Sequence, residues 1–134
     1  MKKFFVFILS ITIVFGIGCG SGSTPKTELS KASGEYSFEV PNNKISTAKV
    51  KVANDLKSLS FELVTATQSG CTGELNGDAV LQGGAVFVYK AKYQDVECKL
   101  ELKFSADTLV ISESGMCSHG AGCSFNGAYT KSIK

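Results

Sequence analysis

The stretch Cys71–Leu81, CTGELNGDAVL, decides the fold class because small or apolar residues alternate in it with mostly polar ones. A period of two residues is typical of a half-buried β-strand. The pair Asn76-Gly77 is one that often marks a hairpin turn, but the alternation runs through it without a change of phase. We therefore expect one long strand with a small inner face, in which the glycines allow a bend or a bulge.

The same period of two recurs on both sides of this stretch. It is seen upstream at 36–40, 48–52 and 59–63, and downstream at 85–91, 98–104, 109–111 and 123–129. Turn-forming residues separate these runs at 41–44, 54–55, 82–84, 93–95 and 105–107. About eight short strands with short turns predict an all-β fold, an antiparallel up-and-down meander that closes into a small barrel. Closure also removes the two exposed edge strands.

The downstream cysteines support this meander. Because successive strands alternate in direction, it places four of them at one mouth of the barrel: Cys71, Cys98, Cys117 and Cys123. Four cysteines in an exported domain predict two disulfides. We favour the pairs 71–98 and 117–123, because Cys117 and Cys123 flank an expected hairpin loop. Pairing Cys98 with Cys117 is equally easy, but it leaves Cys71 to reach Cys123 across the barrel.

A metal site is the alternative use of this region. Cys117, His119 and Cys123 are potential ligands. Their spacing fits no closed zinc pattern well, and an oxidising compartment would pair the thiols first. We therefore expect no metal and no cofactor.

The N-terminus has the features of a secretory signal peptide. Lys2 and Lys3 precede an apolar run, Phe4–Ile17, which ends in small residues at Gly18-Cys19. The run is shorter than the roughly 20 residues that a membrane-spanning helix needs. A cleaved export signal is the interpretation that fits best.

The segment FGIGCG at 15–20 resembles the lipobox of bacterial lipoproteins. That resemblance implies that residues 1–18 are removed and that Cys19 carries the lipid as the first mature residue. Gly16 departs from the pattern, since the family usually has Leu there. Gly20 is not the Asp that resembles an inner-membrane retention signal in some bacteria, so the outer membrane is favoured. A plain secretory signal with a fortuitous cysteine is the alternative.

Composition divides the mature chain into two parts. Residues 19–33 are rich in Ser, Gly and Lys, which predicts a flexible tether behind the lipidated cysteine. A helical turn at 27–32 is compatible with the sequence, but we expect nothing apolar to hold it in place. Residues 34–134 form the barrel domain.

Charge and catalytic motifs exclude several functions. The chain has 14 basic residues against 12 acidic ones and no Arg, and loss of Lys2 and Lys3 balances the charge. We therefore expect no nucleic-acid partner. His119 is the only histidine, and no nucleophile–base pattern accompanies it, so we expect no enzyme.

A non-catalytic binding module remains the preferred function. Tyr93, Met116 and His119 are the candidate residues of its binding loop, and the expected partner of this monomer is another protein. The domain weakly resembles small disulfide-stapled β-barrel lipoproteins such as membrane-bound lysozyme inhibitors, which would make it an inhibitor. Their inhibitory loop carries Ser, Gly and Tyr. Here Ser33-Gly34-Glu35-Tyr36 stands at the entrance to the first strand, so that role is not transferred.

Two other functions stay open. Gly73, Gly77 and Ala79 on the small inner face could leave a cavity for a small apolar ligand. The same small residues could instead accommodate large side chains from neighbouring strands, as in a filled barrel. A structural envelope lipoprotein without a discrete ligand is the third possibility.

Overall fold

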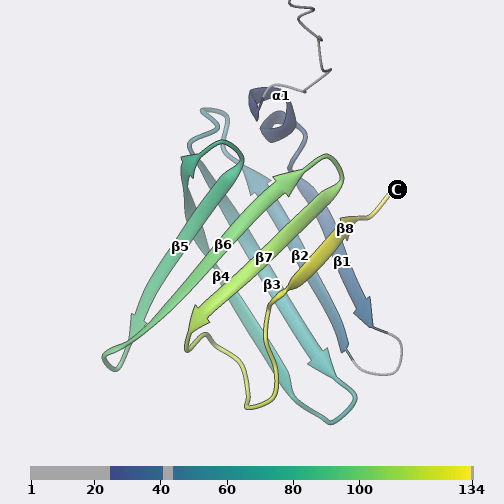
Figure 1. Cartoon of the computed structure of the whole chain (residues 1–134), viewed down its shortest axis with the longest axis vertical. Helices are drawn as coiled ribbons and strands as arrows, with labels where there is room; N and C mark the ends of the chain where they lie inside the picture. Colours follow the sequence, from purple (N-terminus) through teal and green to yellow (C-terminus); the bar gives the residue numbers. More distant parts are fainter. Residues whose placement is uncertain (1–24, 41–43, 134) are drawn as a thin grey trace, which may run out of the picture.

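The computed structural model describes residues 25–40 and 44–133. Within them the chain forms a short helix and eight strands: α1 (Pro25–Ser30), β1 (Gly34–Val40), β2 (Lys44–Val52), β3 (Ser58–Thr67), β4 (Thr72–Gly83), β5 (Val86–Tyr93), β6 (Val96–Ser105), β7 (Thr108–Gly115) and β8 (Gly127–Lys131). The strands are antiparallel, follow one another in sequence order and close into a barrel (Figure 1). The predicted fold is therefore confirmed. Most of the expected turn at 41–44 lies outside the described residues.

All of the stretch Cys71–Leu81 except Cys71 lies in one strand, β4, as its alternation predicts. β4 pairs with β3 without interruption from Ser58↔Val80 to Ala66↔Thr72, and the ladder includes Asn76 and Gly77. Leu75 and Ala79 are buried, whereas Glu74, Asn76 and Asp78 are exposed. The Asn-Gly pair makes no turn here because β3 pairs with β4 continuously across it.

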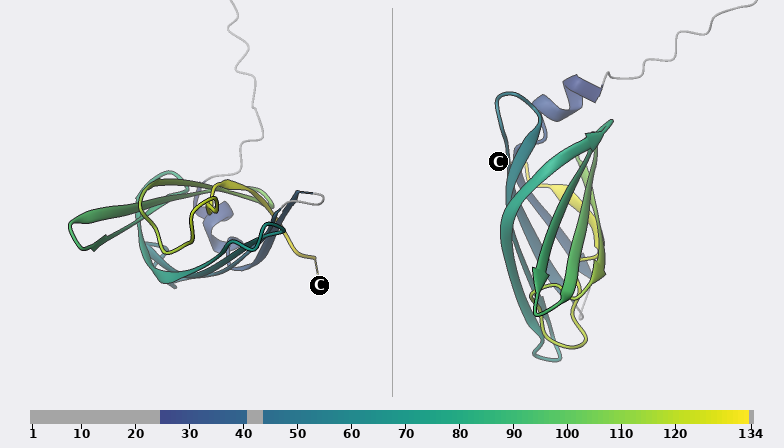
Figure 2. Two further views of the ribbon diagram at one scale, coloured as in Figure 1. Left: turned by 90° about the horizontal axis from the view of Figure 1, so that it is seen from below. Right: turned by 90° about the vertical axis from the view of Figure 1, so that its left-hand side faces the viewer.

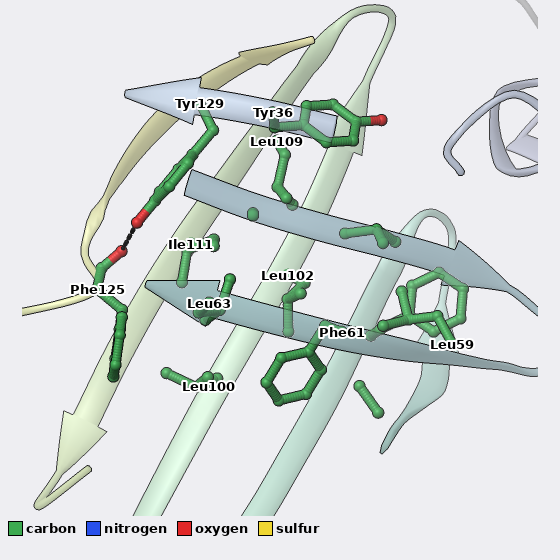
Figure 3. Packing of buried hydrophobic residues seen from close by; sticks show 14 of the residues in the cluster. Tyr36, Leu59, Phe61, Leu63, Leu100, Leu102, Leu109, Ile111, Phe125 and Tyr129 are labelled. Atoms are coloured by element: carbon green, nitrogen blue, oxygen red, sulfur yellow. Dashed lines mark hydrogen bonds between the residues drawn. The ribbon is translucent and has the colours of Figure 1, made fainter. Parts of the chain in front are cut away.

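The core fills the inside of the barrel with residues of the predicted inward parity (Figure 3). Phe61, Leu75, Leu102 and Phe125, from different parts of the chain, are all at most 4% exposed. Aromatic rings meet edge to face inside the barrel, as Phe87 and Phe104 do at 6.0 Å. The hydroxyl of Tyr129 is buried, but it donates a hydrogen bond to the Phe125 carbonyl at 2.8 Å.

The two ends of the barrel are closed differently. We call the end covered by α1 the helix mouth and the opposite end, where the four cysteines lie, the disulfide mouth (Figures 1 and 2). At the helix mouth, Leu29 and Ala32 are 3% and 2% exposed and belong to the core. The Tyr36 hydroxyl donates to the Ala32 carbonyl at 2.7 Å. The expectation that nothing apolar holds this segment is therefore wrong, because Leu29 and Ala32, three residues apart, pack on the barrel.

Two of the eight ladders are short. β1 and β8 pair only at Tyr36↔Lys131 and Ser37↔Thr130. β4 and β5 pair only between Val80↔Val88 and Gly83↔Val86, with a register shift after Leu81. Toward the disulfide mouth β5 diverges from β4 together with β6, and this hairpin projects from the side of the barrel (Figures 1 and 2).

The last strand is shorter than predicted. We expected a strand over 123–129, but β8 begins only at Gly127. Cys123 and Phe125 are buried as their parity predicts, yet both lie in an irregular segment before β8. The chain between β7 and β8 is therefore a long loop over the disulfide mouth, and this decides how the cysteines pair.

Candidate functional site

The disulfide mouth brings the four cysteines together in two bonds. Cys98 is joined to Cys117 and Cys71 to Cys123. Two disulfides at one mouth are confirmed, whereas the favoured pairs 71–98 and 117–123 are wrong. The Cα–Cα distance is 4.8 Å for Cys98–Cys117 and 5.9 Å for Cys71–Cys123, and both lie within the usual range for disulfides.

The pairing follows from the loop between β7 and β8, which is not a simple hairpin. β7 ends at Gly115, directly opposite Cys98 on β6, so Cys117 lies beside Cys98. The loop then crosses to β4, where His119 bridges to Gly73 and the Gly120 N–H donates to the Thr72 carbonyl at 3.1 Å. This contact with β4 carries Cys123 to Cys71. The prediction from the sequence disfavoured this pairing because it placed Cys71 and Cys123 on opposite sides of the barrel. The loop itself spans that distance.

A carboxylate on β7 holds this loop in place. The Glu113 side chain is 7% exposed, and its Oε1 lies 2.5 Å from the His119 Nε2. Its Oε2 accepts the Phe125 N–H at 2.8 Å. The backbone N–H of Glu113 donates to the Asn126 Oδ1 at 2.7 Å, in place of a strand partner. Together these bonds tie both halves of the loop to the end of β7.

His119 is engaged through both ring nitrogens. Its Nδ1 faces the Gly120 carbonyl at 2.9 Å and its Nε2 faces the Glu113 carboxylate. Both partners are acceptors, so the full set of bonds requires the doubly protonated ring. Burial opposes that charge, but the hydrogen bonds to Glu113 and Gly120 outweigh it, and the pKa of His119 is raised.

Lys44 completes the charged cluster under the loop. Its Nζ donates to the Asn126 carbonyl at 3.0 Å and lies 5.3 Å from the centre of the Phe38 ring. Burial lowers the pKa of Lys44, and the nearby Glu113 carboxylate opposes this change only in part. The cluster alternates in charge, Lys44 then Glu113 then His119, which is an arrangement that stabilises a loop.

The metal alternative does not fit this arrangement. Cys117 and Cys123 are both in disulfides, so neither offers the thiolate that a zinc site needs. In the described part of the chain no group of three or more His, Cys, Asp or Glu side chains is placed to hold a metal ion. His119 instead stabilises the loop through its contact with Glu113.

Exposed apolar side chains gather in the half of the barrel nearest the disulfide mouth. Nine large apolar side chains are exposed among the described residues, and six lie in this half of the barrel: Val40, Ile45, Val64, Tyr93, Val96 and Met116. Met116 is the most exposed of these six, at 67%. We call these six residues the apolar rim. Exposed apolar side chains concentrated in one region mark an interaction surface more often than scattered ones do.

The candidate binding residues are only partly brought together. Tyr93 and Met116 line one hollow of about 290 Å³ with Gln94, Val96, Cys117 and Ser118. His119 lines a neighbouring hollow of about 530 Å³ with Val64, Gly73 and Glu74, and Cys117 and Ser118 border both. Tyr93 and Met116 are thus surface residues, whereas His119 holds the loop between β7 and β8 in place.

The interior beside the small face of β4 is filled. A methyl group at Gly77 would come within 2.6 Å of the Tyr89 ring, and one at Gly73 would meet the Cβ of His119. The Tyr89 ring also packs edge to face on Phe61 at 5.1 Å. Large side chains therefore occupy the space that an apolar ligand would need at these glycines.

Sequence reasoning missed Glu113, Lys44 and Asn126. A signal for Glu113 was present, because the inward alternation Leu109, Ile111 continues to residue 113 and places a carboxylate on the inner face. A charged residue at an inward position needs a partner, and the single histidine was the natural one. Lys44 and Asn126 carry no comparable signal, since their roles depend on the path of the loop.

Comparisons with known proteins assign no family. No protein-family model, curated protein or solved structure matches the chain.

Among the described residues, no helix combines the length and the apolar character required to cross a membrane.

Proposed function

We propose that the protein is a lipid-anchored, non-catalytic binding module of the bacterial cell envelope, which engages another protein through the apolar rim of its disulfide mouth. The observation that carries this proposal is the contrast between the two ends. Core packing closes the helix mouth, while six exposed apolar side chains lie at the disulfide mouth, one on its covalently fixed loop and five on the strands around it.

The position of α1 supports the anchoring part of the proposal. Cys19 stands six residues before Pro25, so the chain between them spans at most about 22 Å. α1 packs on the helix mouth, opposite the disulfides (Figure 1). An acylated Cys19 would keep the helix mouth near the bilayer and leave the apolar rim facing away from it. Export through an oxidising compartment also accounts for two disulfides.

The filled interior supports a protein partner over a small apolar ligand. Tyr89 and His119 occupy the space beside Gly77 and Gly73, and the hollows described here open at the surface. Aromatic residues and Met are enriched in protein interfaces, and Tyr93 and Met116 border the same hollow. An inhibitor of another protein is one form that this function can take.

Site-specific photo-cross-linking tests the binding part. A photoreactive amino acid replaces Met116 in one variant and Val80 in another, because Val80 is 57% exposed but lies toward the helix mouth. We expect a discrete protein adduct in native membranes from position 116 and not from position 80. Equal adducts at both positions, or none at either, would contradict the proposal and favour a structural envelope protein.

Intact mass measurement tests the anchor. We expect the mature chain to begin at Cys19 and to carry acyl chains, and Cys19→Ser to release the protein from the membrane fraction. A mature N-terminus at another residue, free of lipid, would exclude the lipid anchor while leaving the cross-linking result to be judged separately.

A further inference from the structure

The lower part of β5 is an open strand edge. Its ladder with β4 ends at Val80↔Val88, whereas its ladder with β6 continues to Tyr93↔Val96. The segment Tyr89–Tyr93 is therefore paired on one side only among the described residues. β5 and β6 project from the barrel at this point, and β4 runs away from them (Figures 1 and 2).

The hairpin fixes which backbone groups are free. Gln94 and Asp95, both with positive φ, form a two-residue turn, so Tyr93 and Val96 are a hydrogen-bonded pair. Such pairs recur at every second residue of an antiparallel ladder. Ala91 and Tyr89 thus also bond to β6. The N–H and C=O groups of Lys90 and Lys92 then point toward the open edge.

The other edge of this opening is partly covered. On β4, Thr72 and Gly73 already pair with the loop at His119 and Gly120. Inside the barrel, the Tyr89 ring packs against Gly77 and keeps the interior closed. The hollow lined by Tyr93 and Met116 lies between the hairpin and this loop. The open edge of β5 therefore leads directly into the candidate binding surface.

We propose that the partner adds an extended segment to the edge of β5 as a further β-strand, with acidic residues at alternate positions facing Lys90 and Lys92. This inference rests on the proposed binding function and specifies its mode. Strand addition uses free main-chain groups for affinity and alternate side chains for specificity.

Charge selects the class of partner. Lys90 and Lys92 are exposed on the outer face of β5, and the one ion pair of Lys92, with Asp95 at 3.6 Å, is itself exposed among the described residues. Opposite charges across neighbouring strands stabilise their pairing. On the facing strand β4, Glu74 and Asp78 are exposed on the outer face. An acidic segment is attracted to β5 and repelled by β4, so it adds to one edge and does not bridge both. Its apolar side chains would point inward, on the side of Ala91.

The same lysines disfavour a second copy of this chain. The segment 89–93 reads YKAKY and is symmetric about Ala91. In an antiparallel pair of two β5 edges centred on Ala91, Lys90 of each copy would face Lys92 of the other. Like charges placed directly opposite destabilise a strand pair, and lysines on an edge are a known protection against self-association.

Peptide binding to the full-length chain in detergent tests the proposal. The probe is a fluorescent heptapeptide, Glu-Val-Glu-Val-Glu-Val-Glu, and binding is followed by fluorescence anisotropy. One control has Lys in place of Glu, and a second has the same composition with the charges grouped at one end. We expect the alternating acidic peptide to bind at least tenfold more tightly than either control. Equal binding of the three peptides would overturn the proposal.

Two substitutions at position 90 separate the contribution of the side-chain charge to binding from that of the backbone N–H. Lys90→Gln removes the charge and keeps the N–H, and we expect it to weaken binding about threefold. Lys90→Pro also removes the edge N–H, which β6 does not use, and we expect a further loss of about tenfold. Equal affinities of the two variants would exclude strand addition. Circular dichroism checks that both fold.

Amide hydrogen exchange on the unmodified chain tests the same proposal without any substitution. Binding of the acidic peptide should slow exchange at Lys90 and Lys92 and leave Val80, a ladder residue, unchanged. Unchanged exchange at both lysines would overturn the proposal. A dimer in sedimentation that Lys90→Pro dissociates would also overturn it, in favour of a second copy. A cross-link from position 116 without any peptide binding would refute strand addition of an acidic segment while the proposed function stands.

Discussion

The helix mouth and the disulfide mouth close the same barrel by opposite means. At the helix mouth Leu29, Ala32 and Tyr36 extend the apolar core, and the buried Tyr36 hydroxyl is satisfied by a backbone carbonyl. At the disulfide mouth, two covalent bonds and a charged cluster hold a loop that lies beside exposed apolar side chains. One end is an extension of the core, and the other is a surface kept in shape by bonds that do not depend on burial.

The difference teaches where binding can evolve in a small barrel. Apolar side chains at the helix mouth are used for stability and are hidden from a partner. At the disulfide mouth the cross-links supply stability that burial of apolar side chains would otherwise supply, so residues such as Met116 can stay exposed.

Removal of the Cys71–Cys123 bond should have the largest effect. The bond closes 52 residues against 19 for Cys98–Cys117, and loop-closure entropy then predicts losses of about 4 and about 3 kcal/mol for the two double Ala variants. Urea unfolding under oxidising conditions measures both free energies. Losses below about 1 kcal/mol for both variants would mean that the disulfide mouth does not depend on its cross-links.

Truncation of Leu29 at the helix mouth should have the next largest effect. Leu29 is 3% exposed, and Leu→Ala changes in a core cost about 2–5 kcal/mol. We expect the lower end of that range, because α1 has six residues and can detach without opening the barrel. Met116→Ala is the matched control from the other mouth. Its effect should stay within about 0.5 kcal/mol, since the side chain is 67% exposed.

Equal losses for Leu29→Ala and Met116→Ala would break the comparison between the mouths. Thermal unfolding followed by circular dichroism reports the barrel. Hydrogen exchange at Ala32, whose N–H donates to the Leu29 carbonyl at 3.2 Å, reports the local detachment of α1.

A methyl group on the small face of β4 should have a moderate effect. Gly77→Ala places a Cβ within 2.6 Å of the Tyr89 ring, which must then move, at a cost of about 1–3 kcal/mol. Gly83→Ala, near the end of the same strand, meets nothing within 4 Å and should be nearly neutral. A neutral Gly77→Ala would show that the interior beside β4 has room, and the small-ligand alternative would regain support.

Parity was the part of this structure that the sequence could predict. The alternation placed Phe61, Leu75, Leu102 and Phe125 inside, because a strand leaves each side chain only two directions. The alternating direction of successive strands placed all four cysteines at one mouth. The disulfide partners could not be predicted in this way. Cys117 and Cys123 belong to a loop, and its crossing to Gly73 depends on contacts between segments far apart in the chain.

The same limit explains the other differences. α1 and the turn that follows it pack through Leu29 and Ala32, three residues apart, but a six-residue helix shows no sustained period of 3.6 residues. The open edge of β5 is invisible in the sequence, since Lys90 and Lys92 read as ordinary outward residues. Which neighbour a strand lacks is decided by the curvature of the whole sheet.

The smallest predicted effect concerns the protonation of His119. Its pKa is raised in the folded state relative to the usual value of 6.5, because its bonds to Glu113 and Gly120 outweigh the opposing effect of burial. A raised pKa means that the folded state binds the proton more tightly than the unfolded state. The stabilisation is therefore complete below about pH 6.5, and it is lost as the pH rises through the folded-state pKa.

His119 is the only histidine, so no other imidazole contributes to the titration between pH 6 and pH 8. We expect the free energy of unfolding to fall slightly from pH 6 toward pH 8, and NMR titration of the ring to show a raised pKa. Glu113→Gln should move that pKa back down by removing the charged acceptor, and His119→Gln should remove the dependence on pH in this range. A pKa at or below the usual value in the unmodified chain would mean that Glu113 does not hold the loop through a charged ring. The disulfide mouth would then rely on its two covalent bonds and on the hydrogen bonds of Glu113 and Lys44 to Phe125 and Asn126.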